Sequence, residues 1–116
     1  MQKLELNLKA VSQNAYNNLH WAVKGDLKKE FEHAIFFKSK SDKLKPITKY
    51  PITIEYLFCI GDGRKHDVDN YAITVKFIND GLRLAGVIEE DDMEHIDTVI
   101  LKAKRDEQDK IIIKIK

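Results

Sequence analysis

The sequence predicts an α+β fold, a two-layer sandwich in which helices cover one face of a mixed four-stranded sheet. Short segments of alternating or continuous apolar residues indicate strands, and two longer segments with apolar residues every three or four positions indicate helices. Their order along the chain is β-α-β-α-β-β. A length of 116 residues suits one domain, residues 1–116, with a single core.

The amino-terminal segment predicts a strand followed by a polar loop. Leu4, Leu6 and Leu8 alternate with polar residues, which is typical of a strand with one buried face. The segment from Ser12 to Asn18 is polar, and we expect a loop whose backbone amides and amide side chains can contact phosphates.

A first helix is expected after a break at Lys24-Gly25-Asp26, with Leu27, Phe31 and Ile35 on its apolar side. Trp21 precedes this break. Its favoured interpretation is a buried aromatic residue, and the alternative is stacking on an exposed base.

A basic linker from Lys38 to Lys49 follows, and it either contacts DNA or is simply a solvated loop. The apolar run from Ile52 to Ile60 predicts a second strand, covered on both faces at its end. The run includes Cys59, the only cysteine, which we expect to be buried. A turn is expected at Asp62-Gly63.

A second helix is predicted from Asp67 to Ala85, because apolar residues recur there at three- and four-residue steps. These residues are Tyr71, Val75, Ile78, Leu82 and Ala85. Asp67 or Asp69 can cap its start, and Gly86 can close its end in the left-handed conformation. Two final strands, residues 96–104 and 111–116, are expected to form an antiparallel hairpin.

Carboxylates are concentrated around this second helix. Asp69, Lys76 and Asp80 fall within about 40° of one another on the face opposite the apolar stripe. The segment Glu89-Glu90-Asp91-Asp92 follows the helix and can add carboxylates if the chain doubles back. Several ionised carboxylates held close together require a cation, and Mg²⁺ suits aspartates that leave room for a phosphate. The alternative is a simple helix cap and a solvated acidic turn.

The net charge is only +1, but it is unevenly distributed. Residues 1–66 contain 12 Lys/Arg and 7 Asp/Glu, residues 67–100 contain 2 and 9, and residues 101–116 contain 6 and 3. A basic body around an acidic centre is typical of phosphate-binding walls beside a metal site. No long apolar stretch or charged leader indicates a membrane span or secretion signal, and the lone cysteine fits a reducing cytoplasm.

The centre of the chain contains the pattern Arg64-Lys65-His66-Asp67-Val68-Asp69-Asn70, Lys76 followed by Asp80, Gly86, and the pair Asp91-Asp92. This pattern resembles the RusA family of Holliday-junction resolvases. The resemblance covers most of the chain and is much more specific at the centre than at the ends. The amino-terminal segment, including Asn14, His20-Trp21, Lys24 and Lys28-Lys29, is similar to phage-type members.

The resemblance implies a magnesium-dependent endodeoxyribonuclease that resolves four-way DNA junctions, with Mn²⁺ as a possible substitute for Mg²⁺ and a homodimer as the active form. Asp67, Asp69 and Asp92 would be the catalytic and metal-binding carboxylates, with Asp91 as the alternative to Asp92. Lys76 would be the catalytic lysine. It departs from the family pattern, because Ile73 stands at the expected position and Lys76 comes three residues later.

The residues expected to contact DNA are Asn14, Lys24, Lys28, Lys29, Arg64, Lys65 and Asn70. Two other classes of function remain open. One is a catalytically silent protein that binds junctions or single strands, and the other is a small α+β interaction module whose acidic loop contacts a partner.

Overall fold

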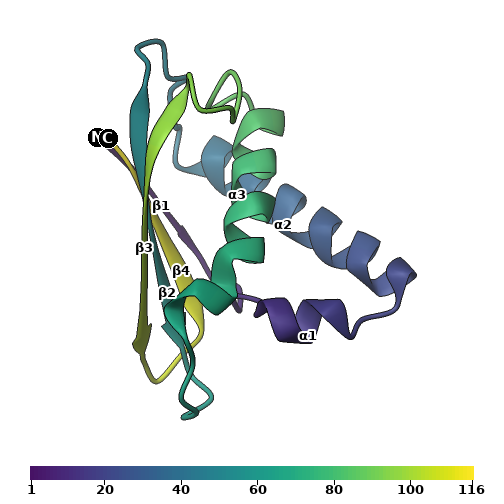
Figure 1. The fold of residues 1–116 in the computed structure, drawn as a ribbon. Coiled ribbons are helices and arrows are strands. Elements are labelled where there is room, and N and C mark those ends of the chain that lie inside the picture. The colour runs from purple at the N-terminus through teal and green to yellow at the C-terminus, as the bar shows by residue number, and fades with distance from the viewer.

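The computed structural model describes residues 1–116 and confirms the predicted α+β arrangement, an open four-stranded sheet with helices packed on one face (Figure 1). The strands are β1 (Gln2–Leu6), β2 (Ile52–Ile60), β3 (Ile96–Arg105) and β4 (Lys110–Ile115). The helices are α1 (Gln13–Asn17), α2 (Trp21–Ser41) and α3 (Ala72–Leu84), and a 3-10 turn, η1 (Val68–Tyr71), leads into α3.

The sheet has the strand order β1-β4-β2-β3. β2 and β3 run parallel, whereas β4 is antiparallel to both β1 and β2. The expected hairpin between the last two strands is therefore wrong, because β2 lies between them. Strand β4 is central and buries Ile111, Ile113 and Ile115, while β3 is a mostly exposed edge strand. The more apolar strand occupies the position that removes more apolar surface from water.

The connection between β3 and β4 crosses the end of β2 at Gly61. A Cβ atom on Gly61 would lie 3.3 Å from backbone atoms of both Glu107 and Asp109, so this position favours glycine. The Gly61 N–H donates to the Asp109 carboxylate at 2.8 Å, and the Asp106 N–H donates to the Ile60 carbonyl at 3.0 Å. These contacts allow a short connection to pass over an intervening strand.

Helix α2 is longer than expected at both ends. The His20 ring accepts a hydrogen bond from the Ala22 N–H at 3.2 Å, and the helix continues through Gly25 without a break. It ends at Ser41, so the first residues of the expected basic linker are helical. Packing of α2 against the core outweighs the helix-breaking tendency of glycine, about 1 kcal/mol relative to alanine. The burial expected for Trp21 is also wrong, because its side chain is 77% exposed.

The segment expected as a polar loop contains the short helix α1. Its start is capped by the Ser12 hydroxyl, which accepts from the Ala15 N–H at 3.1 Å. The preceding residue, Val11, exchanges two hydrogen bonds with the Thr74 hydroxyl of α3, each 2.9 Å long. These bonds fix α1 beside the start of α3.

Helix α3 buries the predicted apolar stripe against the sheet, and Gly86 ends it with a φ of 76°, as expected. The expected cap by an aspartate side chain is absent at Asp67, and η1 precedes the regular helix instead. The face expected to be polar is partly buried: Asp80 is only 7% exposed, because α2 packs across α3 at Gly81. Cys59 is buried in β2, as predicted.

Candidate nucleic-acid interface and the Lys76 network

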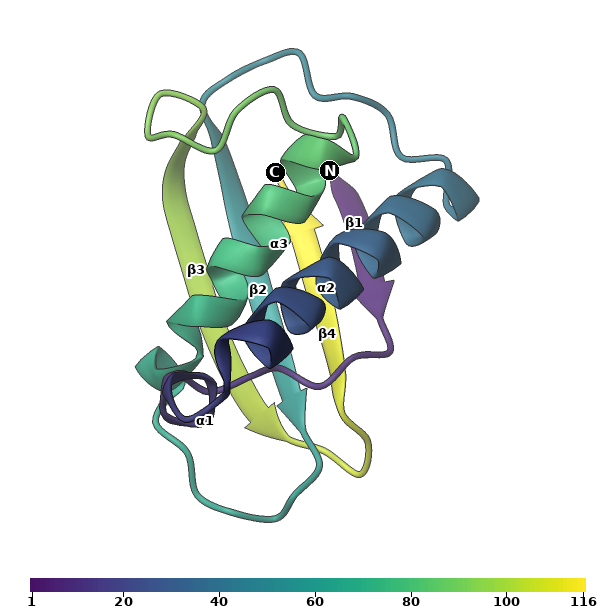
Figure 2. The ribbon, with the colours of Figure 1, turned by 90° about the vertical axis from the view of Figure 1, so that its right-hand side faces the viewer.

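Strands β2 and β3 finish at the same end of the molecule (Figure 2). A basic cleft of about 750 Å³ lies there. The loop after β2, η1, the start of α1 and the last residues of β3 form its walls. Four of the seven predicted DNA-binding residues line it, namely Asn14, Arg64, Lys65 and Asn70. The structure thus brings together residues that are more than fifty positions apart in the sequence.

Two further cations line this cleft, Lys104 and Arg105, which the sequence analysis did not identify. They reach it because β3 pairs in parallel with β2, which places Lys104 opposite Cys59 and Arg105 opposite Ile60. The basic composition of the last sixteen residues was visible in the sequence. The parallel pairing that carries two of these cations to the cleft was not.

The cations of the cleft are not neutralised by neighbouring carboxylates. No carboxylate oxygen lies within 4.0 Å of the charged nitrogens of Arg64, Lys65, Lys104 or Arg105, although nine other Lys and His side chains of the protein form such pairs. The cleft contains a single acidic residue, Asp67. Unpaired cations around an open cleft create a positive potential that attracts an anionic ligand such as a phosphate backbone.

The loop that carries Arg64 is held by Asp62. The Asp62 carboxylate accepts a hydrogen bond from the Arg64 N–H at 2.9 Å and contacts His66 Nε2 at 2.9 Å. These two interactions, the first of them the larger, lower the pKa of Asp62. Gly63 turns the chain between them with a φ of 72°. These contacts therefore hold the backbone of Arg64 in place.

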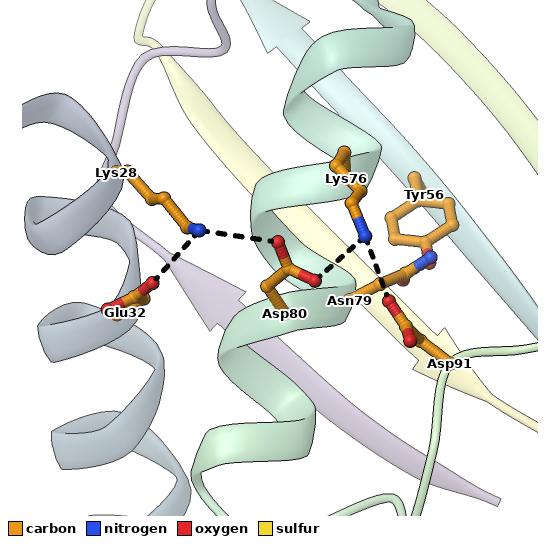
Figure 3. Close-up of polar contacts among 7 residues, drawn as sticks. All are labelled: Lys28, Glu32, Tyr56, Lys76, Asn79, Asp80 and Asp91. Carbon is orange, nitrogen blue, oxygen red and sulfur yellow. Dashed lines mark hydrogen bonds and ion pairs between the residues drawn. The ribbon is translucent and has the colours of Figure 1, made fainter. Parts of the chain in front are cut away.

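Lys76 occupies a second polar centre, halfway along α3 (Figure 3). Its ammonium donates to Asp80 at 3.0 Å and to Asp91 at 3.3 Å. Both hydrogen bonds, that from Asp80 first, raise the pKa of Lys76. Burial opposes ionisation of Asp91, but the contacts with Lys76 outweigh it and the pKa of Asp91 is lowered. Lys76 therefore joins α3 to the acidic loop that follows it.

The network extends to α2 and to the sheet. Lys28 lies 3.8 Å from Asp80 and 4.0 Å from Glu32, so Asp80 sits between two ammonium groups (Figure 3). On the other side, the buried Tyr56 hydroxyl donates to the side-chain oxygen of Asn79. Burial raises the pKa of Tyr56, so its hydroxyl remains protonated. The centre is thus a satisfied network of polar groups between the two layers.

Asp92 is engaged in the turn that precedes β3. It accepts hydrogen bonds from the backbone N–H groups of Glu94 and His95, each at 3.1 Å, and contacts His95 Nδ1 at 2.6 Å. The contact with the imidazole is the largest cause of two opposite shifts, because it lowers the pKa of Asp92 and raises that of His95.

The four aspartates expected at a metal site are divided between the two ends of α3. Asp67 and Asp69 precede the helix and Asp91 and Asp92 follow it. Asp91 nevertheless reaches back to Lys76 (Figure 3). Thirteen helical residues span about 20 Å. No group of three or more His, Cys, Asp or Glu side chains lies where it could hold a metal ion. Their oxygen chemistry suits Mg²⁺, but their positions in this chain do not form one centre for it.

The three predicted DNA-binding lysines of α2 lie outside the cleft. Lys24 is positioned over the Tyr16 ring, 4.9 Å from its centroid, and Lys28 belongs to the Asp80 network. Lys29 is exposed and has no carboxylate oxygen within 4.0 Å. Of these three, Lys29 is the one whose charge is fully available to a ligand.

The fold and this site define a small α+β protein with an unneutralised basic cleft at one end of a mixed sheet. No model of a known protein family matches the chain, and no curated protein matches its sequence. None of its helices combines the length and the apolar composition that crossing a membrane requires.

Proposed function

We propose that this protein is a magnesium-dependent, structure-selective endodeoxyribonuclease that resolves four-way DNA junctions by paired phosphodiester hydrolysis. The observation that carries the DNA-binding part is the cleft with four cations that have no carboxylate partner. The nuclease part rests on the resemblance of the central sequence to RusA resolvases. Mn²⁺ as a substitute for Mg²⁺, a homodimer and a cytoplasmic location belong to the same proposal.

The residues of the cleft have separable tasks in this proposal. Arg64, Lys65, Lys104 and Arg105 hold phosphates, and the amides of Asn14 and Asn70 add neutral hydrogen-bond donors. Asp67 places one carboxylate beside the bound backbone. A homodimer would present two such clefts related by a two-fold axis, which matches the symmetry of a four-way junction.

A second candidate is a protein that binds junctions or single strands without cutting them. The position of Lys76 favours it, because this residue is engaged with Asp80 and Asp91 rather than with the cleft. The separation of the aspartates along α3 favours it as well. Both candidates share the same DNA-binding surface and differ only in chemistry.

Cleavage of a labelled synthetic four-way junction separates the two candidates. The controls are a linear duplex and a single strand of the same sequence, each with and without Mg²⁺ or Mn²⁺. Metal-dependent paired nicks in the junction alone support the nuclease. Tight binding without cuts under all conditions supports the silent binder, and the absence of salt-dependent DNA affinity favours the interaction module.

The role of the cleft is tested by Arg105→Ala, with Arg83→Ala as the matched control. Both residues are exposed arginines without ion pairs, but only Arg105 lines the cleft, and Arg83 lies in the last turn of α3. If Arg105 contacts a phosphate, its loss should reduce the slope of log affinity against log salt by about 0.9 for duplex arms. The Arg83 variant should retain the wild-type slope. Identical slopes for both variants would argue against this cleft as the DNA surface.

A further inference from the structure

An apolar pocket of about 550 Å³ adjoins the basic cleft. Nine of its fifteen lining residues are hydrophobic, and they come from the segment after β1, from α1 and the turn after it, from the first half of α2 and from η1. Leu8, Val11, Leu19, Val23 and Leu27 contribute aliphatic surface. The pocket lies at the same end of the molecule as the cleft, between α2 and the loop after β2.

The two cavities lie side by side and share part of their lining. Ser12, Arg64 and His66 line both of them. A group seated in the pocket is therefore close to a group seated in the cleft. A ligand that fills both must combine an apolar part with an anionic part, since four unpaired cations surround one cavity and aliphatic side chains surround the other.

The pocket also has hydrogen-bond acceptors at its edge. Glu30 and Asp62 both line it, and Glu30 forms no ion pair. The carboxylate of Asp62 has a lowered pKa, so it is ionised at neutral pH and able to accept further hydrogen bonds. The exocyclic amino groups of adenine, cytosine and guanine are donors of the kind that such carboxylates accept.

We propose that this pocket receives one unstacked nucleobase of the DNA whose phosphates lie in the basic cleft. A nucleobase has apolar faces and polar edges, and a single sugar links it to the phosphate backbone. These properties match an apolar pocket that has carboxylates in its lining and adjoins a cationic cleft. The inference rests on the proposed DNA binding and specifies which feature of the DNA is recognised: a nucleotide that is not stacked in a duplex.

The test compares two DNA duplexes that differ in one group. One contains a single unpaired adenosine at its centre, and the other contains an abasic site at that position, so that the phosphate charge and the backbone length are matched. We expect the duplex with the unpaired adenosine to bind about tenfold more tightly than the abasic duplex, because contacts with a base add affinity. Equal affinity for the two duplexes, with normal salt dependence, would overturn the proposal that the pocket receives a base. It would leave the DNA-binding proposal intact. No salt-dependent binding of either duplex would overturn both.

A pair of variants locates the effect. Val23→Glu places a charge in the pocket, whereas Val99→Glu places the same charge on β3; these valines are 47% and 46% exposed, so both variants are expected to fold. The preference for the base should be lost in Val23→Glu and retained in Val99→Glu. A preference retained in both would place base recognition elsewhere and overturn the inference. A hydrophobic peptide or a second copy of the chain in this pocket would give no preference for the base.

Discussion

The ammonium of Lys76 lies 3.3 Å from a carboxylate oxygen of Asp91, fifteen residues further along the chain. This contact fastens the acidic loop after α3 to the middle of the helix (Figure 3). The contact also limits what Lys76 can do, because its charge is shared between Asp80 and Asp91. The residue expected to be catalytic therefore has a structural role as well.

Lys76→Met should reduce the free energy of unfolding by about 1 kcal/mol, because the nearly buried Asp80 loses its closest donor and keeps only the more distant Lys28. The loss stays modest because Lys76 is 62% exposed and solvent screens its charge. Urea unfolding measures it. Arg83→Met, which removes an unpaired cation from the same helix, should have little effect, and an equal loss in both variants would contradict the assigned role.

Stability should depend on pH through His95. Its pKa is raised by Asp92, so the interaction stabilises the protein fully below the ordinary histidine pKa of about 6.5 and is lost as the pH rises through the raised value. The interaction is also lost in acid, when the pH falls through the lowered pKa of Asp92 and the carboxylate becomes protonated. His95→Ala should therefore lower the melting temperature more at about pH 5.5 than at about pH 9. His33→Ala, an exposed histidine on α2, is the control and should show no such difference.

Gly81 should tolerate a side chain poorly. A Cβ at this position would lie 2.6 Å from Cδ1 of Ile35, which is fully buried, so Gly81→Ala should destabilise the protein by about 1 kcal/mol or more. Gly25→Ala on α2 has nothing within 4 Å and should stabilise by about 0.5–1 kcal/mol.

Ile35→Val identifies the cause, because it removes the atom that an alanine at position 81 would meet. The cost of Gly81→Ala should shrink in that background, which denaturant unfolding of the double-mutant cycle measures. Additive effects would show that the contact between the helices is not responsible.

Asp69→Asn tests the chemistry apart from binding. If this carboxylate takes part in cleavage, junction cutting should fall by about a hundredfold, while junction affinity stays similar or rises because a negative charge near phosphates is removed. Gel-based cleavage and binding assays on the same preparation provide both readouts, and Asp26→Asn is a control at an exposed carboxylate on α2. Equal loss of cutting and affinity in a folded variant would count against the assignment.

Local patterns in the sequence were sufficient for the four strands and the two long helices, but not for the short helix α1. The alternation of Leu4 and Leu6, the apolar run of β2 and the stripe of α3 depend on side chains a few residues apart, so their periods reveal them directly. Gly86 was predictable for the same reason, since a left-handed residue after a helix is a local requirement. Two of the four cations of the candidate cleft were also predictable, because Arg64 and Lys65 follow β2 in one short segment.

Tertiary structure decided what distant segments do together. The place of β4 between β1 and β2 depends on which strand buries more apolar surface, and the parallel pairing of β3 brings Lys104 and Arg105 to the cleft. The exposure of Trp21 and the burial of Asp80 depend on how α2 crosses α3. The sequence by itself determined the four strands, the two long helices and the kinds of charge available. Only the tertiary structure, in which packing between distant residues replaces contact with solvent, determined which charges form ion pairs and which stay unpaired.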